Sequence, residues 1–209
     1  MDALGPQKWW PGRTRFEVIV GAILVQNTSW TNVERAIGAL RKERLLTAVR
    51  IARTPVGQLA TLIRSSGYFR QKARKLHEFV RFLETRHDGS LDKMFDTPTE
   101  ELRAQLLSVH GIGPETADSI LLYAGRHPVF VVDAYTRRIL GRHEVVPKQS
   151  SYEDIRRLME KSVPSNVSLF NEFHALIVEV GKRFCRPKAP KCSACPLNCF
   201  LPGQVEGSR

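Results

Sequence analysis

Long apolar runs are absent from the sequence: no stretch reaches the roughly 18 to 20 residues that a membrane-spanning helix needs. The opening segment, MDALGPQKWWPGR, also lacks the apolar core of a secretory signal. Cysteine is absent before residue 185, which excludes a disulfide framework across most of the chain. We therefore expect an intracellular, cytoplasmic protein.

Acidic residues are scarce relative to basic ones. The chain has 32 lysines and arginines against 21 aspartates and glutamates, a formal net charge of +11 and a pI near 9.9. Such a surplus is typical of proteins that bind a phosphate-rich partner, and nucleic acid is the first candidate. A generally basic soluble protein and a binder of membrane surfaces are the alternatives.

Strand signals are also scarce, because apolar residues recur at intervals of three and four almost throughout, as they do in helices. This spacing predicts helices in FEVIVGAILVQ, TNVERAIGALRKERLL, VGQLATLIRSSG, ARKLHEFVRFLETR, SYEDIRRLMEKSV and NEFHALIVEVGKRF. Only PVFVV, residues 128–132, resembles a strand. The hydrophobic content of 42% is typical of a globular protein. Together with the helical spacing and the lack of an internal repeat, it predicts an all-α globular fold.

Two Thr-Pro pairs mark predicted helix starts. Thr54 and Pro55 precede VGQLATLI, and Thr97 and Pro98 precede TEELRAQLLSV. We expect each threonine to cap its helix and each proline to take the first helical position. Glu100 then stands three residues after Thr97, which is the spacing of a capping box.

The stretch HGIGPETADSILLYA follows the predicted helix LRAQLLSV, which gives a helix, a tight turn and a second helix that starts at Pro114. Gly111 and Gly113 permit positive φ and a close approach of the backbone to a ligand. Free N–H groups at the start of the second helix suit an anion such as a phosphate. An ordinary αα-hairpin with a glycine turn is the alternative.

A lone aspartate, Asp133, ends the apolar run VFVV and precedes AYTRRILGR. We expect its carboxylate to cap the following helix, and the helix dipole to lower its pKa so that it is ionised at neutral pH. An ionised carboxylate in a groove can stabilise positive charge in a reaction. A purely structural cap is the alternative.

All four cysteines lie in the short loop CRPKAPKCSACPLNC, with six, two and three residues between them. They are Cys185, Cys192, Cys195 and Cys199. Four thiolates on one loop of an intracellular protein suit a 4Fe-4S cluster, and zinc is the alternative.

Taken together, VHGIGPETA, VFVVDAYTRR and the four-cysteine loop resemble the helix-hairpin-helix DNA glycosylases related to endonuclease III. The segment FEVIVGAILVQNTSWTNVERAI also resembles the early helix and loop of that superfamily, so the resemblance covers nearly the whole chain. It implies a two-lobed, all-α base-excision-repair enzyme. The partner would be double-stranded DNA with a damaged base, which is flipped out of the helix, and we expect a nucleoid-associated monomer with no membrane partner.

The resemblance also implies the extent of the two lobes. A helical-barrel lobe would span 16–125 and contain the helix-hairpin-helix at about 105–124. The second lobe would combine 1–15 with 126–209 and end in the cluster loop at 185–199. For that loop the resemblance favours iron-sulfur over zinc. The family's usual last cysteine interval is five residues rather than three, so the path of the loop is expected to differ.

Roles for single residues follow from the same resemblance. Asp133 would be the catalytic carboxylate and Gln26 the wedge that fills the gap left by the flipped base. The phosphate contacts would fall on Gly111, Ile112, Gly113 and Thr116. The base pocket would include Trp9, Trp10, Trp30, Tyr68 and Glu115.

Core packing is the alternative role for the aromatic residues. Beside Tyr68, we expect Lys72, Arg70 and Arg74 to be solvated or to face phosphates.

The endonuclease III pattern has a nucleophilic lysine where this chain has Glu115. Because a carboxylate cannot form a Schiff base, we expect simple hydrolysis that leaves the abasic site intact. Among family branches, WWPG, HGIGPETADSILLYA and VVDAYT most resemble 3-methyladenine DNA glycosylase III, whose positively charged substrate an aromatic pocket would attract. The alternatives are a bifunctional glycosylase and AP lyase acting on oxidised pyrimidines, a glycosylase for mismatched uracil or thymine, and a non-catalytic DNA-binding module.

Overall fold

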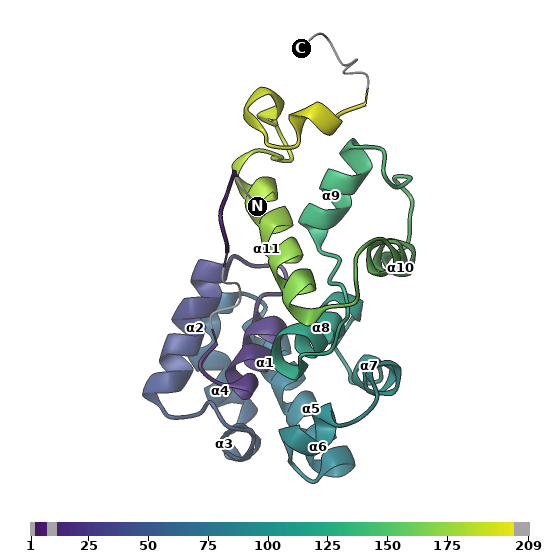
Figure 1. The fold of residues 1–209 in the computed structure, drawn as a ribbon. Helices are drawn as coiled ribbons and strands as arrows, with labels where there is room; N and C mark the ends of the chain where they lie inside the picture. Colours follow the sequence, from purple (N-terminus) through teal and green to yellow (C-terminus); the bar gives the residue numbers. More distant parts are fainter. Residues whose placement is uncertain (1–2, 8–11, 203–209) are drawn as a thin grey trace. The chain divides into compact units, whose positions relative to one another are not determined.

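The computed structural model describes residues 3–7 and 12–202. The chain divides into two compact units, residues 10–127 and residues 1–9 with 128–209 (Figure 1), and each unit is described by itself. The boundary between His127 and Pro128 lies a few residues from the predicted lobe boundary. The assignment of the units as functional lobes stays a prediction.

The regular elements in the described part of unit 10–127 are all helical. They are α1 (Arg15–Leu24), α2 (Trp30–Lys42), α3 (Ala48–Arg53), α4 (Val56–Leu62), η1 (Arg64–Ser66), α5 (Phe69–His87), α6 (Leu91–Phe95), α7 (Thr99–Leu107), α8 (Pro114–Ser119) and η2 (Ile120–Gly125). Helix α1 packs against α2, α5, α8 and η2, and nearly all of its residues are buried. This burial explains why FEVIVGAIL is apolar on nearly every side rather than on one stripe, and its one charged residue, Glu17, is paired with Arg41.

The two Thr-Pro starts differ from the prediction by one residue. Pro55 and Pro98 are the N-caps, and their carbonyl oxygens accept the first bonds of α4 and α7. Neither threonine caps the following helix, because each hydroxyl donates back to the helix before it: Thr54 to the Arg50 carbonyl at 2.7 Å and Thr97 to the Lys93 carbonyl at 3.4 Å. The capping box predicted for α7 is therefore wrong.

The helix predicted for PETADSILLYA starts at Pro114, as expected, but changes geometry after Ser119. The segment Ile120–Gly125 is the π-helix η2, which ends at Arg126 with a left-handed φ of 59°. A side chain at Gly125 would overlap the Phe95 ring, so close packing requires glycine there. Single π turns are wider than the α-helix by one residue and are frequent near functional sites.

Two buried polar side chains in this unit, Arg103 and His127, have well-defined partners. The guanidinium of Arg103 donates to Asp118 from Nε at 2.6 Å, and both side chains are almost fully buried. The imidazole of His127 lies between the Thr99 hydroxyl, 2.9 Å from Nδ1, and the Phe95 carbonyl, 3.1 Å from Nε2. Burial lowers the pKa of His127, so its neutral form fits this site, with Nε2 as donor because a carbonyl only accepts.

The second unit contains α9 (Ala134–Arg142), α10 (Tyr152–Ser162), α11 (Val167–Arg183), η3 (Cys192–Ala194) and η4 (Asn198–Phe200). The segment 128–132 forms no strand, and the described residues of the chain contain no strand elsewhere, which confirms the all-α prediction. Helix α11 packs along α9 where Gly181 leaves room for the Tyr135 ring. It begins earlier than NEFHALIVEVGKRF predicted, because the Asn166 side chain caps it at Val167.

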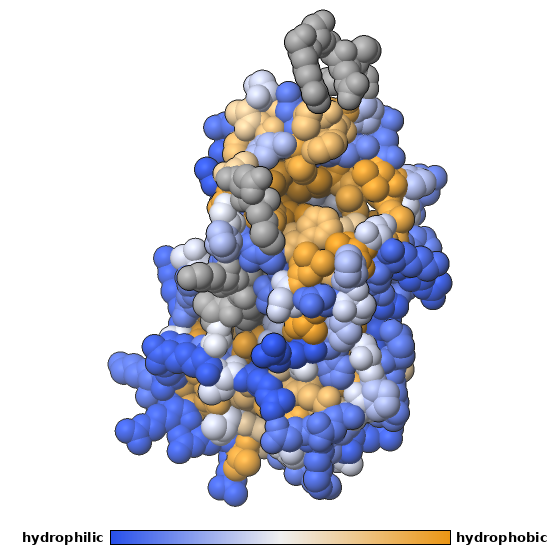
Figure 2. Space-filling model, in the orientation of Figure 1, coloured by the Kyte–Doolittle hydropathy of each residue, from blue (hydrophilic) through white to orange (hydrophobic). Residues whose placement is uncertain are grey.

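Figure 2 shows where polar and apolar side chains gather on one face of the molecule. Hydrophilic side chains cover the surface around α2 and α3, while apolar residues gather over α9, α11 and the C-terminal segment. Among the described helices, none combines the length and the apolar character that a membrane span requires.

Candidate active site

The turn between α7 and α8 has one glycine in the left-handed region. Gly111 has φ +88°, and a Cβ built there would lie 2.5 Å from Cγ of Lys75, whose stem crosses the turn. Gly113 has φ −95° as the N-cap of α8, with nothing within 4 Å of a built Cβ. The positive φ that glycine permits is therefore used at Gly111 and not at Gly113.

The four residues predicted to contact phosphate differ in exposure and in whether their polar groups are already hydrogen-bonded. The Ile112 side chain is buried, and its backbone N–H already donates to the Val109 carbonyl at 3.0 Å. Thr116 is also buried, and its hydroxyl accepts a bond from Gln26. Of the four predicted contacts, Gly113 is the exposed one, and Gly111 is half-buried. We infer that the turn would contact phosphate through its backbone near Gly113 rather than through the Ile112 amide.

Gln26, the predicted wedge, is half-buried beside the turn. Its Nε2 donates to the Thr116 hydroxyl at 2.7 Å and to the Gly111 carbonyl at 3.2 Å, while its Oε1 accepts from Nζ of Lys75. Burial lowers the pKa of Lys75. Both ends of the amide are thus engaged, and a wedge role would require Gln26 to leave these three partners. Its neighbour Asn27 is exposed, with a left-handed φ of 53°.

Lys72 corrects a further prediction, because it is neither solvated nor free to face phosphate. It is 2% exposed, and its ammonium donates to the Leu24 carbonyl at 2.8 Å and the Ser66 carbonyl at 2.6 Å. Burial, followed by the nearby charge of Lys75, lowers the pKa of Lys72 to about 8. Lys72 therefore ties the end of α1 to the turn before α5, while its neighbours Arg70 and Arg74 are exposed as expected.

Asp133 caps α9, as the sequence predicted. Its Oδ1 accepts from the Thr136 backbone N–H at 2.7 Å and from the Thr136 hydroxyl at 2.9 Å. Its Oδ2 lies 3.6 Å from Nε2 of His174, and its side chain is 13% exposed. Burial raises the pKa of Asp133, but His174 and then Thr136 outweigh it and lower the pKa below its usual value. The direction of the shift agrees with the prediction.

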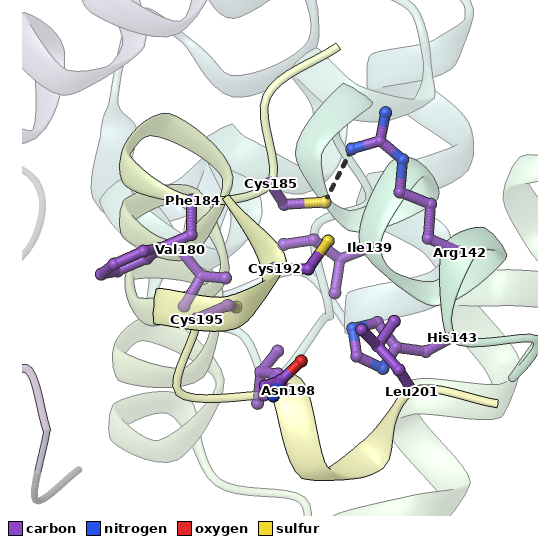
Figure 3. Close-up of a pocket in the computed structure, with 11 residues that line it drawn as sticks. Ile139, Arg142, His143, Val180, Phe184, Cys185, Cys192, Cys195, Asn198 and Leu201 are labelled. Atoms are coloured by element: carbon purple, nitrogen blue, oxygen red, sulfur yellow. Dashed lines mark hydrogen bonds between the residues drawn. The ribbon is translucent and has the colours of Figure 1, made fainter. Parts of the chain in front are cut away.

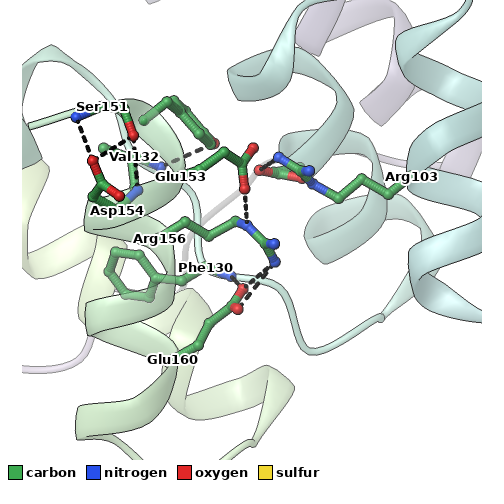
Figure 4. Close-up of polar contacts among 10 residues, drawn as sticks. Arg103, Phe130, Val132, Ser151, Glu153, Asp154, Arg156 and Glu160 are labelled. Carbon is green, nitrogen blue, oxygen red and sulfur yellow. Dashed lines mark hydrogen bonds and ion pairs between the residues drawn. The ribbon is translucent and has the colours of Figure 1, made fainter.

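The segment that leads to Asp133 is fixed by side chains of α10. The Phe130 N–H donates to Oε1 of Glu160 at 2.9 Å, and the Val132 N–H donates to the Tyr152 hydroxyl at 3.2 Å. The buried Arg156 guanidinium holds Glu160 in place at 3.0 Å (Figure 4). These bonds satisfy backbone groups that a strand would have paired with a neighbouring strand, so an apolar run can stay outside a sheet.

Aromatic residues predicted for the base pocket have different environments. Trp30 lines a concavity of about 450 Å³ with Glu17, Glu34 and Arg41, and its Nε1 donates to Oε1 of Glu34 at 3.1 Å. Trp9 and Trp10 lie outside the described residues.

Tyr68 is neither buried in the core nor a lining residue of this concavity. It is 66% exposed at the start of α5, with a left-handed φ of 46°. A non-glycine residue in that region carries strain, which is frequent where a side chain is presented for binding. Glu115 is exposed in the first turn of α8, where an acid also suits the helix dipole.

Three of the four cysteines line one small pocket in the C-terminal loop. Cys185, Cys192 and Cys195 surround it with the apolar residues Ile139, Val180, Phe184 and Leu201 (Figure 3). Cys199 is exposed and is not among the lining residues. All four are free thiols, and within the described residues no group of three or more cysteine, histidine or acidic side chains is arranged to hold a metal ion.

Arginines of α9 fasten this loop. Arg142 donates from Nη1 to the Cys185 sulfur at 3.2 Å and to the Arg186 carbonyl at 2.6 Å. Arg138 donates from Nε to the Cys185 carbonyl at 2.7 Å. The type and clustering of the four cysteines fit a metal-thiolate group, and the two arginines would place positive charge beside those thiolates.

His174 is the residue of this site that sequence reasoning missed. It lies in the buried face of α11, and the segment FHALIVEV reads only as an apolar helix that contains one histidine. Its position beside Asp133 depends on how α11 packs against α9, which local sequence does not report. In the sequence, the only feature that could have indicated a role for His174 is that it is a single histidine among the apolar residues of this helix.

Comparison with known proteins identifies the family. The profile of the HhH-GPD superfamily of base excision DNA repair proteins matches residues 20–165, more than half of the chain. The chain belongs to this superfamily. It is 46% identical over 202 residues to a Methanocaldococcus jannaschii protein assigned as a DNA repair glycosylase, with 96% of this chain and 91% of the relative covered. The protein is accordingly a DNA glycosylase of the base excision repair type.

Other members of the superfamily are also similar. Endonuclease III of Thermotoga maritima is 29% identical over 191 residues, which cover 91% of this chain and 82% of that protein. The solved H. pylori 3-methyladenine DNA glycosylase bound to 1,N6-ethenoadenine has a TM-score of 0.76 and 27% identity, with 87% and 91% of the two chains covered. An endonuclease III–DNA complex has a TM-score of 0.79 at 22% identity, with 92% and 85% covered, and shows the shared fold.

The turn geometry yields a stability prediction. Replacing Gly111→Ala should lower the free energy of unfolding by about 1 to 3 kcal/mol, because alanine is strained at positive φ and its Cβ would displace the Lys75 stem. Gly113→Ala is the matched control, since that site has negative φ and open space, and it should lose less. Urea denaturation of both variants measures the difference, and equal losses would contradict the assigned geometry.

Proposed function

We propose that the protein is a monofunctional DNA glycosylase in which Asp133 is the catalytic carboxylate. The observation that carries this proposal is a mostly buried carboxylate whose pKa lies below its usual value. Such a group remains ionised at neutral pH inside a site of low dielectric, where its charge acts most strongly.

The proposed reaction is hydrolysis of the bond between a damaged base and its deoxyribose. As that bond breaks, its electron pair leaves with the base and positive charge builds on the sugar, where the Asp133 carboxylate stabilises it. A water molecule then forms the new bond to C1′ and gives up its proton to Asp133 or to the departing base. The sugar-phosphate backbone stays intact, and the product is an abasic site.

Glu115 supports a hydrolytic reaction without strand cleavage. It occupies the position at which the endonuclease III pattern has its nucleophilic lysine, and a carboxylate cannot form a Schiff base. The lysines described near the turn are engaged: Lys72 with two backbone carbonyls and Lys75 with Gln26. We therefore infer that AP lyase activity is absent.

For the substrate, we propose an alkylated purine such as 3-methyladenine, flipped out of double-stranded DNA by a monomeric enzyme. The Trp30 indole lines a concavity of about 450 Å³, which has room for a flat ring, and Glu34 accepts a hydrogen bond from its Nε1. An alkylated purine carries positive charge, which an indole face and nearby carboxylates attract. The likeness to the H. pylori 3-methyladenine glycosylase supports the same substrate class.

For the C-terminal loop, we propose a 4Fe-4S cluster held by Cys185, Cys192, Cys195 and Cys199. When bound, it would hold the loop covalently to one inorganic core. Endonuclease III relatives support this assignment. Arg142 and Arg138 hold the loop against α9 by donating to the sulfur and the carbonyl oxygen of Cys185.

The catalytic assignment predicts the behaviour of Asp133→Asn. This variant keeps the shape and much of the cap but removes the charge, so excision should fall by roughly 100-fold or more while the protein stays folded. Asp154→Asn is the matched control, because Asp154 is an exposed acid in the capping box of α10. Single-turnover excision from methylated DNA measures both.

Borohydride should trap no covalent adduct with the unmodified enzyme. An adduct accompanied by strand cleavage would contradict hydrolysis.

The substrate assignment predicts selectivity among lesions. A panel of methylated, oxidised-pyrimidine and uracil-mismatch DNAs should show release of 3-methyladenine, measured by chromatography of the freed base. Trp30→Ala should reduce that release by roughly 5- to 150-fold, the equivalent of about 1 to 3 kcal/mol of stacking, whereas Trp30→Phe should retain most of it. Excision confined to oxidised pyrimidines would refute the alkylated-purine assignment.

The cluster assignment predicts metal content. Protein purified without air should be brown, absorb visible light and contain roughly four iron atoms and four sulfides per chain. Cys199→Ser should lose most of this iron, whereas Ser193→Ala, in the same loop, should keep it. Stoichiometric zinc without iron, in protein purified both with and without air, would assign the loop to zinc instead.

A further inference from the structure

A buried histidine faces the carboxylate that we assign to catalysis. His174 is 4% exposed on α11, and its Nε2 lies 3.6 Å from Oδ2 of Asp133. This separation exceeds an ordinary hydrogen bond, so it is an electrostatic contact in the DNA-free protein. Contacts of this kind commonly shorten when a substrate complex forms.

The two oxygens of Asp133 are held by different helices. Oδ1 receives both Thr136 bonds, at 2.7 and 2.9 Å, from the first turn of α9. Oδ2 faces the imidazole on α11. Both Thr136 bonds go to Oδ1, so by themselves they do not fix the plane of the carboxylate. A second group on Oδ2 fixes that plane.

The imidazole itself is held in orientation. Its ring meets the Phe130 ring edge-on, with centroids 6.4 Å apart and an interplanar angle of 87°. Helix α11 is in turn fixed against α9, where Arg138 donates to the Gly181 carbonyl at 3.3 Å and lies over the Tyr135 ring. The position of Nε2 is therefore set by packing rather than by the conformational preference of one exposed side chain.

We propose that His174 is a positioning residue for Asp133: its Nε2–H points at Oδ2, fixes the plane of the carboxylate and favours its ionised form while positive charge builds on the sugar. This inference rests on the proposed function of Asp133. His174 transfers no proton in the reaction and does not touch the DNA. It acts on the rate of bond cleavage through Asp133 alone.

Two substitutions separate this role from simple packing. His174→Leu fills the space without a donor, and His174→Gln places an amide N–H where Nε2 stands. Phe170→Leu is the control, because Phe170 is a fully buried residue of the same helix that packs edge-on against Phe130. Each variant is measured for thermal stability, for affinity to DNA that contains an uncleavable abasic analogue, and for single-turnover excision.

The expected pattern is a loss of rate without a loss of binding. His174→Leu should excise roughly 100-fold more slowly, the usual cost of misplacing a reacting group, with DNA affinity unchanged within about threefold. His174→Gln should recover most of the rate. In the Asp133→Asn background, His174→Leu should cause no further loss, because the two residues act as one unit. A His174→Leu rate equal to that of the unmodified enzyme, or a Gln variant as slow as the Leu variant, would overturn the proposal.

A spectroscopic measurement tests the same contact without activity. Nitrogen-15 NMR of labelled imidazoles should find a proton on Nε2 of His174, and the signal should shift in Asp133→Asn. A bare Nε2 with the proton on Nδ1 would also overturn the proposal. Failure of the proposed function would look different: no lesion would be excised, or Asp133→Asn would remain active, whatever the result for His174.

Discussion

The candidate active site depends on one helix cap. Oδ1 of Asp133 receives two bonds from Thr136, so the same interaction starts α9 and fixes the carboxylate. The chain reaches that cap through residues 128–132, where the N–H groups of Phe130 and Val132 donate to Glu160 and Tyr152 of α10. Without those bonds the apolar segment would have unsatisfied buried donors. Folding of α10 is therefore a condition for the placement of Asp133.

Local signals predicted the parts of the site that local geometry controls. Proline at the first position of α8, glycine with positive φ at 111 and aspartate at the start of α9 each follow from the conformational limits of one residue. The helical fold follows from apolar spacing in the same way. The predicted N-caps at Thr54 and Thr97 were wrong because both hydroxyls donate to the preceding helix. The preference of threonine for the N-cap position does not take this competing hydrogen bond into account.

Residues that depend on packing were not predictable from local sequence. Lys72 looked like one cation in a basic run, but the fold buries it and gives it two carbonyl acceptors. Gln26 ended a helix and suggested a projecting side chain, yet both ends of its amide are bound beside the turn. His174 lies beside Asp133 only because α11 packs against α9. In each case at least one partner lies far away in the sequence.

The π-helix η2 has a consequence for chain length. A π turn accommodates one more residue than an α turn over nearly the same rise, and η2 lies at Ile120–Gly125, between the glycine turn and Asp133 along the chain. A relative shorter by one residue could have a regular α-helix here and still deliver an aspartate to the start of the following helix. A search that requires a fixed number of residues between the turn and the aspartate would miss such a relative, whereas an alignment that allows a gap within this segment would find it.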